Sequence, residues 1–90
     1  MPMKITVIIP AYNEKNTILE IVRRVQAMKM VDEIIIVDDG STDGTRDLIS
    51  NMDGKNNVRI ILHEKNQGKG AAVRTAISAA TGDVLMIQDA

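Results

Sequence analysis

Four short apolar segments, rich in β-branched residues, alternate along the chain with three longer segments in which apolar and polar positions are interleaved. The apolar segments cover residues 5–9, 33–37, 58–62 and 84–87. Runs of this kind are typical of strands that are buried on both faces of a parallel sheet. We therefore expect four parallel strands with a helix in each connection.

The interleaved segments have the periodicity of helices. Their predicted apolar faces are, in chain order, Ile18, Ile21, Val22 and Val25; Leu48, Ile49 and Met52; and Val73, Ala76, Ile77 and Ala80. Thr17 and Glu20 offer a capping box to the first helix, and Asp43 is a candidate N-cap for the second. Gly54 and Gly82 are expected to end the second and third helices.

The order β-α-β-α-β-α-β predicts right-handed crossovers and an open, Rossmann-like α/β fold, with helices in a layer on each face of the sheet. The 90 residues suffice for one domain. The net charge is −1 without a basic stripe, which argues against nucleic acid as a partner. No Cys is present, so disulfides and zinc–thiolate sites are excluded. The apolar runs are far shorter than the roughly 20 residues that span a bilayer, and we expect a cytoplasmic location, in solution or at the cytoplasmic face of a membrane.

Four segments follow the predicted strand ends: 10–14, 38–43, 63–70 and 89–90. The carboxyl ends of parallel strands share one edge of the sheet, and ligands of open α/β sheets bind beyond that edge. Pro10 has no N–H, so we expect it to end the pairing of the first strand. On this edge Tyr12 could stack on a flat ring and Glu14 could accept from ribose hydroxyls. Equally, Tyr12 could be a packing residue and Glu14 a carboxylate that stabilises a helix start.

Two adjacent carboxylates, Asp38 and Asp39, end the second strand. Neighbouring strand positions point to opposite faces, so one of them can face the cleft, where it could accept from a base N–H or bind a metal. For residues 41–45 a turn that caps a helix without any ligand is the better interpretation. His63 is interpreted as a strand-end residue without a catalytic role.

The segment from Glu64 to Val73 resembles a phosphate-binding loop but lacks both the Walker and the dinucleotide-binding patterns. What remains is a turn before a helix N-terminus, with Lys69 as its cation; taken alone, a plain loop-to-helix start is the better interpretation. Asp89 follows the fourth strand. Together with Glu14 and Asp39 it could hold Mg²⁺ or Mn²⁺ against a diphosphate, since such hard cations prefer oxygen ligands.

The motifs VIIPAYNE, IIIVDDGSTDGT, NQGKGAA and ATGDVLMIQDA, taken in order, resemble the N-terminal half of family-2 glycosyltransferases with the GT-A fold. The nearest likeness is to the dolichyl- or polyprenyl-phosphate sugar synthases. The resemblance covers essentially the whole chain and implies that residues 1–90 are the nucleotide-sugar-binding part of a larger domain.

The resemblance also implies roles for single residues. Substrate contacts would come from Pro10, Tyr12 and Glu14 to the nucleoside, Val37 and Asp39 to the base, Lys69 near the donor, and Asp89 and Ala90 as the start of a D-x-D motif. In that motif Asp89 would help to hold Mg²⁺ or Mn²⁺; the second Asp would be the residue after Ala90, and the sequence departs from the pattern by ending there.

The implied reaction is inverting transfer of a hexose from a UDP- or GDP-linked sugar to an acceptor, with a lipid phosphate favoured as acceptor. We expect this chain alone to bind the donor weakly or to be inactive, and to self-associate through an exposed edge strand. The alternative is a non-catalytic α/β module, such as a receiver-like phosphoacceptor domain. Receiver domains place an Asp pair after the first strand, whereas Asp38 and Asp39 follow the second.

Overall fold

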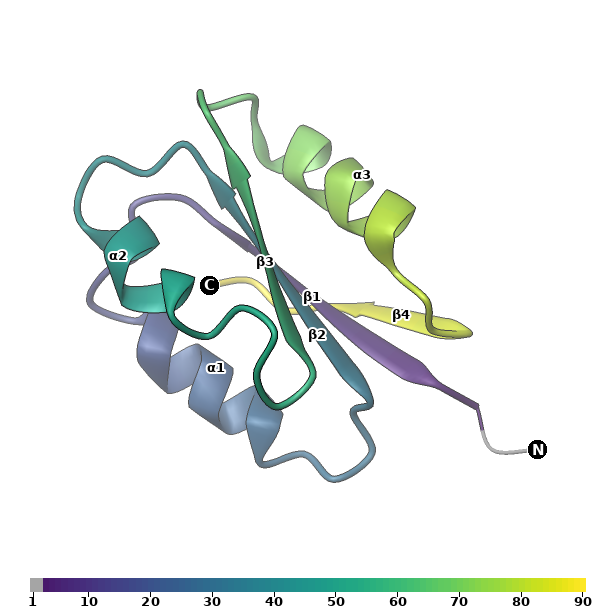
Figure 1. Cartoon of the computed structure of the whole chain (residues 1–90). Helices are drawn as coiled ribbons and strands as arrows, with labels where there is room; N and C mark the ends of the chain where they lie inside the picture. The colour runs from purple at the N-terminus through teal and green to yellow at the C-terminus, as the bar shows by residue number, and fades with distance from the viewer. Residues whose placement is uncertain (1–2) are drawn as a thin grey trace.

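The computed structural model describes residues 3–90 and contains the seven expected elements in the expected order (Figure 1). They are β1 (Ile5–Ala11), α1 (Ile18–Gln26), β2 (Glu33–Asp39), α2 (Thr45–Ser50), β3 (Val58–His63), α3 (Lys69–Ala79) and β4 (Val84–Ile87). The four strands form one sheet in the order β3-β2-β1-β4, and every pairing is parallel. The predicted α/β class is therefore confirmed.

The strand order discriminates between the two functional classes that the sequence left open. In the receiver-like arrangement the first strand lies between the second and the third. Here β2 lies between β1 and β3, and β4 pairs on the far side of β1. This is the 3-2-1-4 order of dinucleotide-binding sheets, whose direction of winding reverses between β1 and β4. The order argues against the receiver-like alternative and marks that reversal as the place for a ligand.

Helices cover both faces of the sheet. In Figure 1, α1 and α2 lie on one face and α3 on the other. On the first face, α1 buries Ile18, Val22 and Val25 against β1 and β2. On the second, Ala72 and Ala76 of α3 pack on Ile8, Ile35 and Val37. Alanine side chains let α3 lie close to the strands, and close helix–sheet packing requires such small residues.

Pro10 does not end β1, contrary to prediction. The strand continues to Ala11, with Pro10 opposite Val37 of β2. Pairing with β4 stops at Ile8, whose carbonyl accepts from the N–H of Gln88. Backbone groups two residues apart on a strand face the same neighbouring strand, so the nitrogen of Pro10, like the carbonyl of Ile8, faces β4. At Pro10 the pairing with β4 has already ended, so no N–H is needed there. No ladder bond is lost, and the proline is tolerated in a central strand.

Neither predicted helix cap forms. The Thr17 hydroxyl donates to the Glu14 carboxylate, and Glu20 pairs with Arg23 and Arg24 instead of reaching back. At α2 the N-cap position is occupied by Gly44, with a left-handed φ of 105°.

Asp43 acts from one residue further out than predicted, since its Oδ1 accepts from the Thr45 N–H at 3.0 Å. Two helices also end earlier than their predicted glycine stops: α2 ends at Ser50 and α3 at Ala79.

Two of the three predicted apolar faces need correction. The face of α1 is confirmed, but Leu48 of α2 is 40% exposed and Ile77 of α3 is 47% exposed. The contact face of α3 is rotated toward Ala72 and Ala76, with Val73 half-buried, and Ala80 lies beyond the helix end. Ala76 is buried as predicted, and Ala72 takes the place expected for Ile77, because close packing on the sheet favours small side chains.

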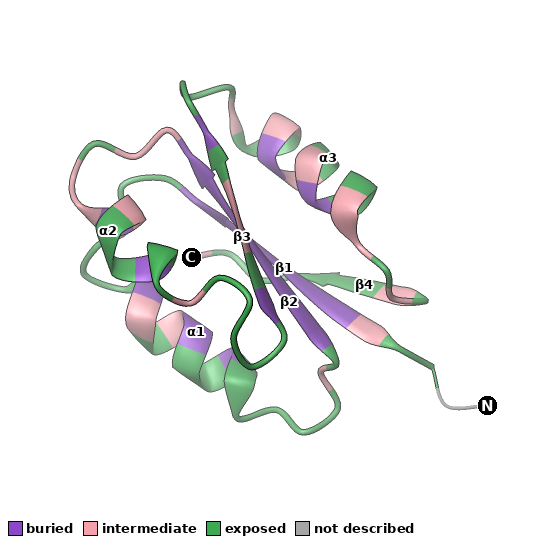
Figure 2. Ribbon diagram, in the orientation of Figure 1, coloured by how far each residue is buried: buried purple, intermediate pink, exposed green. Residues whose placement is uncertain are grey.

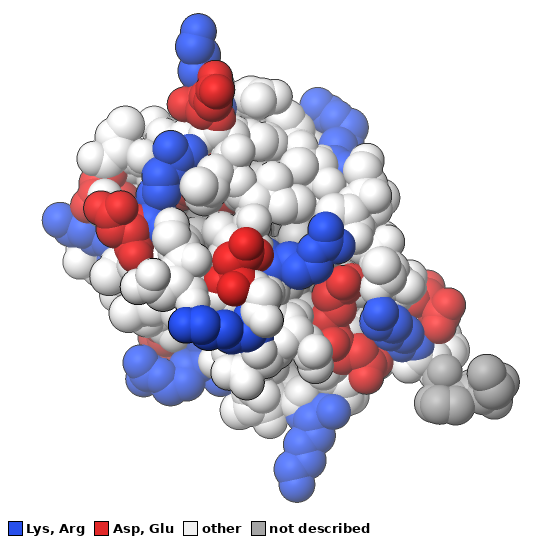
Figure 3. Space-filling model, viewed as in Figure 1, with Lys and Arg blue, Asp and Glu red and all other residues white. Residues whose placement is uncertain are grey.

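The sheet is buried unevenly (Figure 2). β1 and β2 are almost wholly buried, whereas Leu85, Met86 and Ile87 of β4 are exposed. Among residues 3–90, only β1 pairs with β4, so the other edge of β4 is open. Acidic and basic side chains are interspersed on the face shown in Figure 3, without a large patch of one sign. Within the described part of the chain, no helix is long and apolar enough to cross a membrane.

Candidate donor-nucleotide site

A cavity of about 430 Å³ lies at the carboxyl ends of the strands, where the winding of the sheet reverses. The residues that line it are Pro10, Ala11, Tyr12, Glu14, Asp39, Asn66, Lys69, Ala72, Asp89 and Ala90. They come from four segments that are distant in sequence, and all the predicted substrate-binding residues except Val37 are among them. The topology alone brings these side chains together.

The segment after β1 is held in place by the loop after β2. The N–H of Asn13 donates to the Ser41 hydroxyl at 2.9 Å, and its side-chain oxygen accepts from the Thr42 N–H at 2.8 Å. The N–H of Glu14 donates to the Thr45 hydroxyl at 2.9 Å. Residues 41–45 thus stabilise the turn through hydrogen bonds, in line with the structural role interpreted from the sequence. The result is a fixed backbone under Tyr12, a residue that is 46% exposed and lines the cavity.

Asp38 and Asp39 point to opposite faces of the sheet, as the strand geometry predicts, and both are buried. On the α1–α2 face, Asp38 Oδ2 accepts from the Ser41 N–H at 3.1 Å and from Arg46 Nε at 3.3 Å. Its Oδ1 has no hydrogen-bond partner among the described residues. Arg46 also donates to the His63 carbonyl, so it ties the ends of β2 and β3 together. Asp38 therefore has a structural role.

Asp39, on the α3 face, borders the cavity, but its carboxylate is occupied by the chain. Oδ1 accepts from His63 Nδ1 and from the Gln67 N–H, each at 2.9 Å. Oδ2 accepts from the Gly68 N–H at 2.9 Å and from Asn66 Nδ2 at 3.1 Å. Burial raises the pKa of Asp39, but the hydrogen bonds from His63, Gln67 and Gly68 outweigh burial and hold the pKa below its usual value.

Lys69 and Asp89 form an ion pair across the mouth of the cavity. Lys69 is the first residue of α3, and Asp89 follows β4 by two residues. Both side chains are exposed, at 62% and 70%, so the pair contributes little to stability. Its members are free to exchange partners when a charged ligand enters.

The predicted metal set is not assembled. In the part of the chain that the structure describes, no three or more acidic, histidine or cysteine side chains lie close enough together to hold a metal ion. Asp39 is saturated by internal donors, and the Glu14 carboxylate accepts from Thr17 at 3.1 Å. Of the three predicted ligands, Asp89 has the most exposed carboxylate, at 70% of its side chain. One carboxylate together with ligand phosphates is nevertheless a usual arrangement for Mg²⁺, so the residues present fit a metal that arrives with a diphosphate.

Val37 does not line the cavity; its side chain is fully buried beneath α3. Conversely, the sequence reasoning missed Ala11, Asn66 and Ala72. Ala72 could have been found if close helix packing had been given more weight than side-chain size. Asn66 lies in the motif NQGKGAA but was not singled out, because its place at the cavity depends on a loop contact with Asp39.

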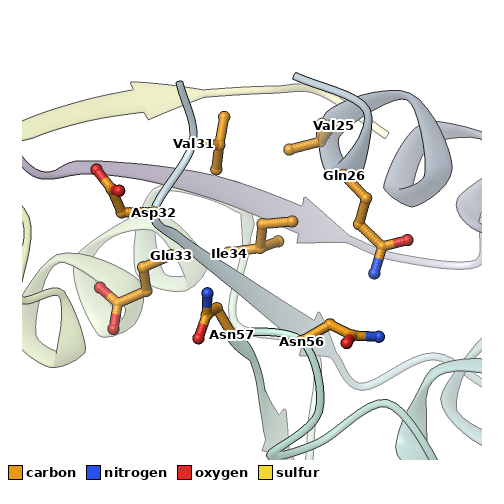
Figure 4. Close-up of a pocket in the computed structure, with 8 residues that line it drawn as sticks. All are labelled: Val25, Gln26, Val31, Asp32, Glu33, Ile34, Asn56 and Asn57. Atoms are coloured by element: carbon orange, nitrogen blue, oxygen red, sulfur yellow. The ribbon is translucent and has the colours of Figure 1, made fainter. Parts of the chain in front are cut away.

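A second cavity, of about 360 Å³, lies at the opposite, amino end of the sheet (Figure 4). It is lined by Val25, Gln26, Val31, Asp32, Glu33, Ile34, Asn56 and Asn57. None of these described lining residues has a basic side chain that could neutralise a phosphate. The carboxyl-end cavity is therefore the better candidate for an anionic ligand.

Comparison with known proteins decides the family. The sequence model of the family described as "Glycosyl transferase family 2" matches residues 6–90. The chain belongs to this family. Among family relatives, an uncharacterised glycosyltransferase from Nostoc sp. PCC 7120 is 41% identical over 90 residues, which cover 98% of this chain and 28% of the relative. Dolichol-phosphate mannosyltransferase from Pyrococcus furiosus is 37% identical, over 98% of this chain and 26% of the relative. The chain thus spans about a quarter of the length of these relatives.

Two solved structures share the fold. A mannosyltransferase from Pyrobaculum calidifontis, in complex with GDP-mannose and Mn²⁺, superposes with a TM-score of 0.88 at 28% identity, over 99% of this chain and 28% of that one. Glucosyl-3-phosphoglycerate synthase from Mycobacterium tuberculosis, in complex with Mn²⁺, UDP and its product, gives 0.77 at 29% identity, over 97% and 33%. Both were solved with a nucleotide or nucleotide sugar and a divalent metal.

Proposed function

We propose that this chain is the donor-binding part of an enzyme that transfers a hexose, with inversion, from a UDP- or GDP-linked sugar to a polyprenyl phosphate. The observation that carries the proposal is the cavity at the winding reversal, which gathers Tyr12, Lys69 and Asp89 in a chain of glycosyl transferase family 2. The names of relatives support the acceptor class: dolichol-phosphate mannosyltransferase, and undecaprenyl-phosphate 4-deoxy-4-formamido-L-arabinose transferase at 31% identity.

Five of the cavity residues have a chemical task in this proposal. The half-exposed ring of Tyr12 stacks on the base, and Pro10 and Glu14 border the nucleoside. Lys69 exchanges its exposed ion pair with Asp89 for the diphosphate oxygens of the donor. A cation held at the start of α3 suits this task, because the N–H groups of a helix N-terminus also favour anions.

Asp89 is the residue that would hold Mg²⁺ or Mn²⁺, at the first position of the D-x-D motif that continues with Ala90. When bound with the donor, the metal supplies neutralisation of the negative charge that develops on the leaving diphosphate. Among the chain's own residues, Lys69 contributes to the same neutralisation.

In the transfer itself, an oxygen of the ionised acceptor phosphate attacks the anomeric carbon of the sugar. A new carbon–oxygen bond forms while the bond to the diphosphate breaks, and the diphosphate leaves with the electron pair. The acceptor is already an anion at neutral pH, so the step needs no strong base. The donor cavity contributes by holding the leaving group in line with the attacking oxygen.

The test is calorimetric titration of the 90-residue chain with UDP, GDP and their sugars, with and without Mn²⁺. We expect binding that requires the metal. Lys69→Met should weaken it roughly tenfold, because one charge-assisted contact to the diphosphate is lost. Lys29→Met, an exposed lysine in the connection between α1 and β2, is the matched control and should bind like the wild type. Absence of binding to every nucleotide would overturn the proposal.

A further inference from the structure

The side chain of His63, at the end of β3, is held between two partners. Nδ1 lies 2.9 Å from Asp39 Oδ1, and Nε2 lies 2.9 Å from the Thr75 hydroxyl of α3. A carboxylate only accepts, so Nδ1 must carry a proton; in the neutral ring Nε2 then accepts from Thr75. His63 is 8% exposed and does not line the cavity, so it reaches a ligand only through its neighbours.

Asp39 links the side chain of His63 to the loop after β3, because its carboxylate bonds to both. Each of its carboxylate oxygens accepts two donors: His63 and Gln67 on Oδ1, Asn66 and Gly68 on Oδ2. A carboxylate offers about four acceptor positions, and here the chain fills them. No position is left for a base N–H unless one of these bonds breaks.

The same loop, at residues 65–66, packs closely against the end of β2. Gly40, with φ of 78°, lies so close to it that a Cβ there would be 2.5 Å from the Asn66 nitrogen. The loop leads directly into Lys69, the first residue of α3 and the cation of the cavity. A shift of the Asp39 carboxylate therefore shifts residues 66–68 and, with them, the start of α3.

We propose that His63 is a positioning residue of the donor site: it holds the Asp39 carboxylate in the orientation that fixes residues 66–68 and thereby sets Lys69 against the donor's diphosphate. This inference rests on the proposed function of the cavity. It gives the Asp39 carboxylate the task of anchoring the loop before α3. Loss of His63 should then weaken diphosphate binding whatever base is attached.

The experiment compares four variants in pairs. His63→Leu removes both hydrogen bonds, whereas His63→Asn keeps an amide donor near the position of Nδ1. Thr75→Val removes the hydroxyl at nearly constant shape, whereas Thr75→Ser keeps it. The probes are UDP, GDP and inorganic pyrophosphate, each with Mg²⁺. We expect His63→Leu to weaken all three by a similar factor, roughly 10- to 100-fold. His63→Asn should recover most of the loss, and Thr75→Val should show a smaller loss that Thr75→Ser restores.

A readout without ligand separates this inference from the proposed function. NMR should show the Nδ1–H tautomer of His63, and amide exchange at Gln67 and Gly68 should be faster in Thr75→Val and His63→Leu than in their conservative partners. Unchanged exchange in all variants would overturn the inference, as would an affinity loss confined to UDP and GDP. If the wild-type chain binds none of the probes, the proposed function fails, and the role of His63 in a donor site fails with it. The amide-exchange rates at Gln67 and Gly68 then still decide whether His63 holds the loop in place.

Discussion

Buried carboxylates at the two ends of β2 show how single residues are accommodated in this fold. Glu33, at the amino end, accepts from the Thr6 hydroxyl at 2.8 Å and from the Thr81 N–H at 3.0 Å. Asp39, at the carboxyl end, accepts from four donors. The sequence could place both residues on a strand, but not identify their partners, because those partners come from neighbouring strands and from loops that only the tertiary fold brings close.

Glu33 gives a prediction about acid stability. Burial raises its pKa, but the hydrogen bonds from Thr81 and Thr6 and the charge of Lys4 outweigh burial and lower the pKa below its usual value. Arg59 also faces it, at 3.9 Å. A carboxylate with a lowered pKa in the folded state stabilises the protein above its unfolded-state pKa of about 4.3, and this stabilisation is lost as the pH falls through the folded-state pKa.

Urea unfolding at several pH values between about 6 and 3 checks this. We expect the free energy of unfolding of Glu33→Gln to fall less steeply with decreasing pH than that of the wild type. The exposed Glu64→Gln variant controls for the change in net charge. Equal slopes for Glu33→Gln and the wild type would contradict the assigned pKa direction.

At the scale of elements, existence, order and the contact face of α1 were predictable, whereas the helix ends and the contact faces of α2 and α3 were not. Length and composition of the apolar runs identify all four strands. The continuation of β1 through Pro10 depends on β4 ending its pairing at Ile8, a tertiary fact that no local pattern contains. The rotated face of α3 has a similar origin, since close approach to the sheet selects Ala72 and Ala76 over Ile77.

The rotated face predicts a clear difference between two isoleucines. Ile36 is fully buried in β2, whereas Ile77 is 47% exposed on α3. Ile36→Ala should lower the free energy of unfolding by about 2–5 kcal/mol. Ile77→Ala should lower it by only about 1 kcal/mol, because half of the side chain remains in water. Denaturant unfolding of both variants measures this, and an equally large loss for Ile77→Ala would restore the originally predicted face.

At the scale of the whole molecule, the convergence of the site was predictable from topology. Once the strands are parallel, the segments after them must share an edge, and the cavity there collects Tyr12, Lys69 and Asp89. What topology could not predict is the internal use of Asp39, or the burial of Val37 away from the cavity. Both follow from how tightly α3 and its preceding loop pack on the sheet.

The open edge of β4 predicts the behaviour of the chain in solution. Leu85, Met86 and Ile87 are exposed beside unpaired backbone groups, and such edges pair with other strands. We expect self-association that increases with protein concentration, measured by light scattering. Met86→Lys should reduce it, because a charge on an edge strand disfavours strand addition. A monomer at every concentration would contradict this.

The most direct test of the central claim is to map where a nucleotide binds. Backbone NMR spectra of the chain, titrated with UDP or GDP in the presence of Mg²⁺, report on both cavities at once. We predict shifts at Tyr12, Lys69 and Asp89 around the carboxyl-end cavity, and none at Gln26, Asn56 and Asn57 around the amino-end cavity. Shifts confined to the amino-end cavity, or no shifts at saturating nucleotide, would contradict the account.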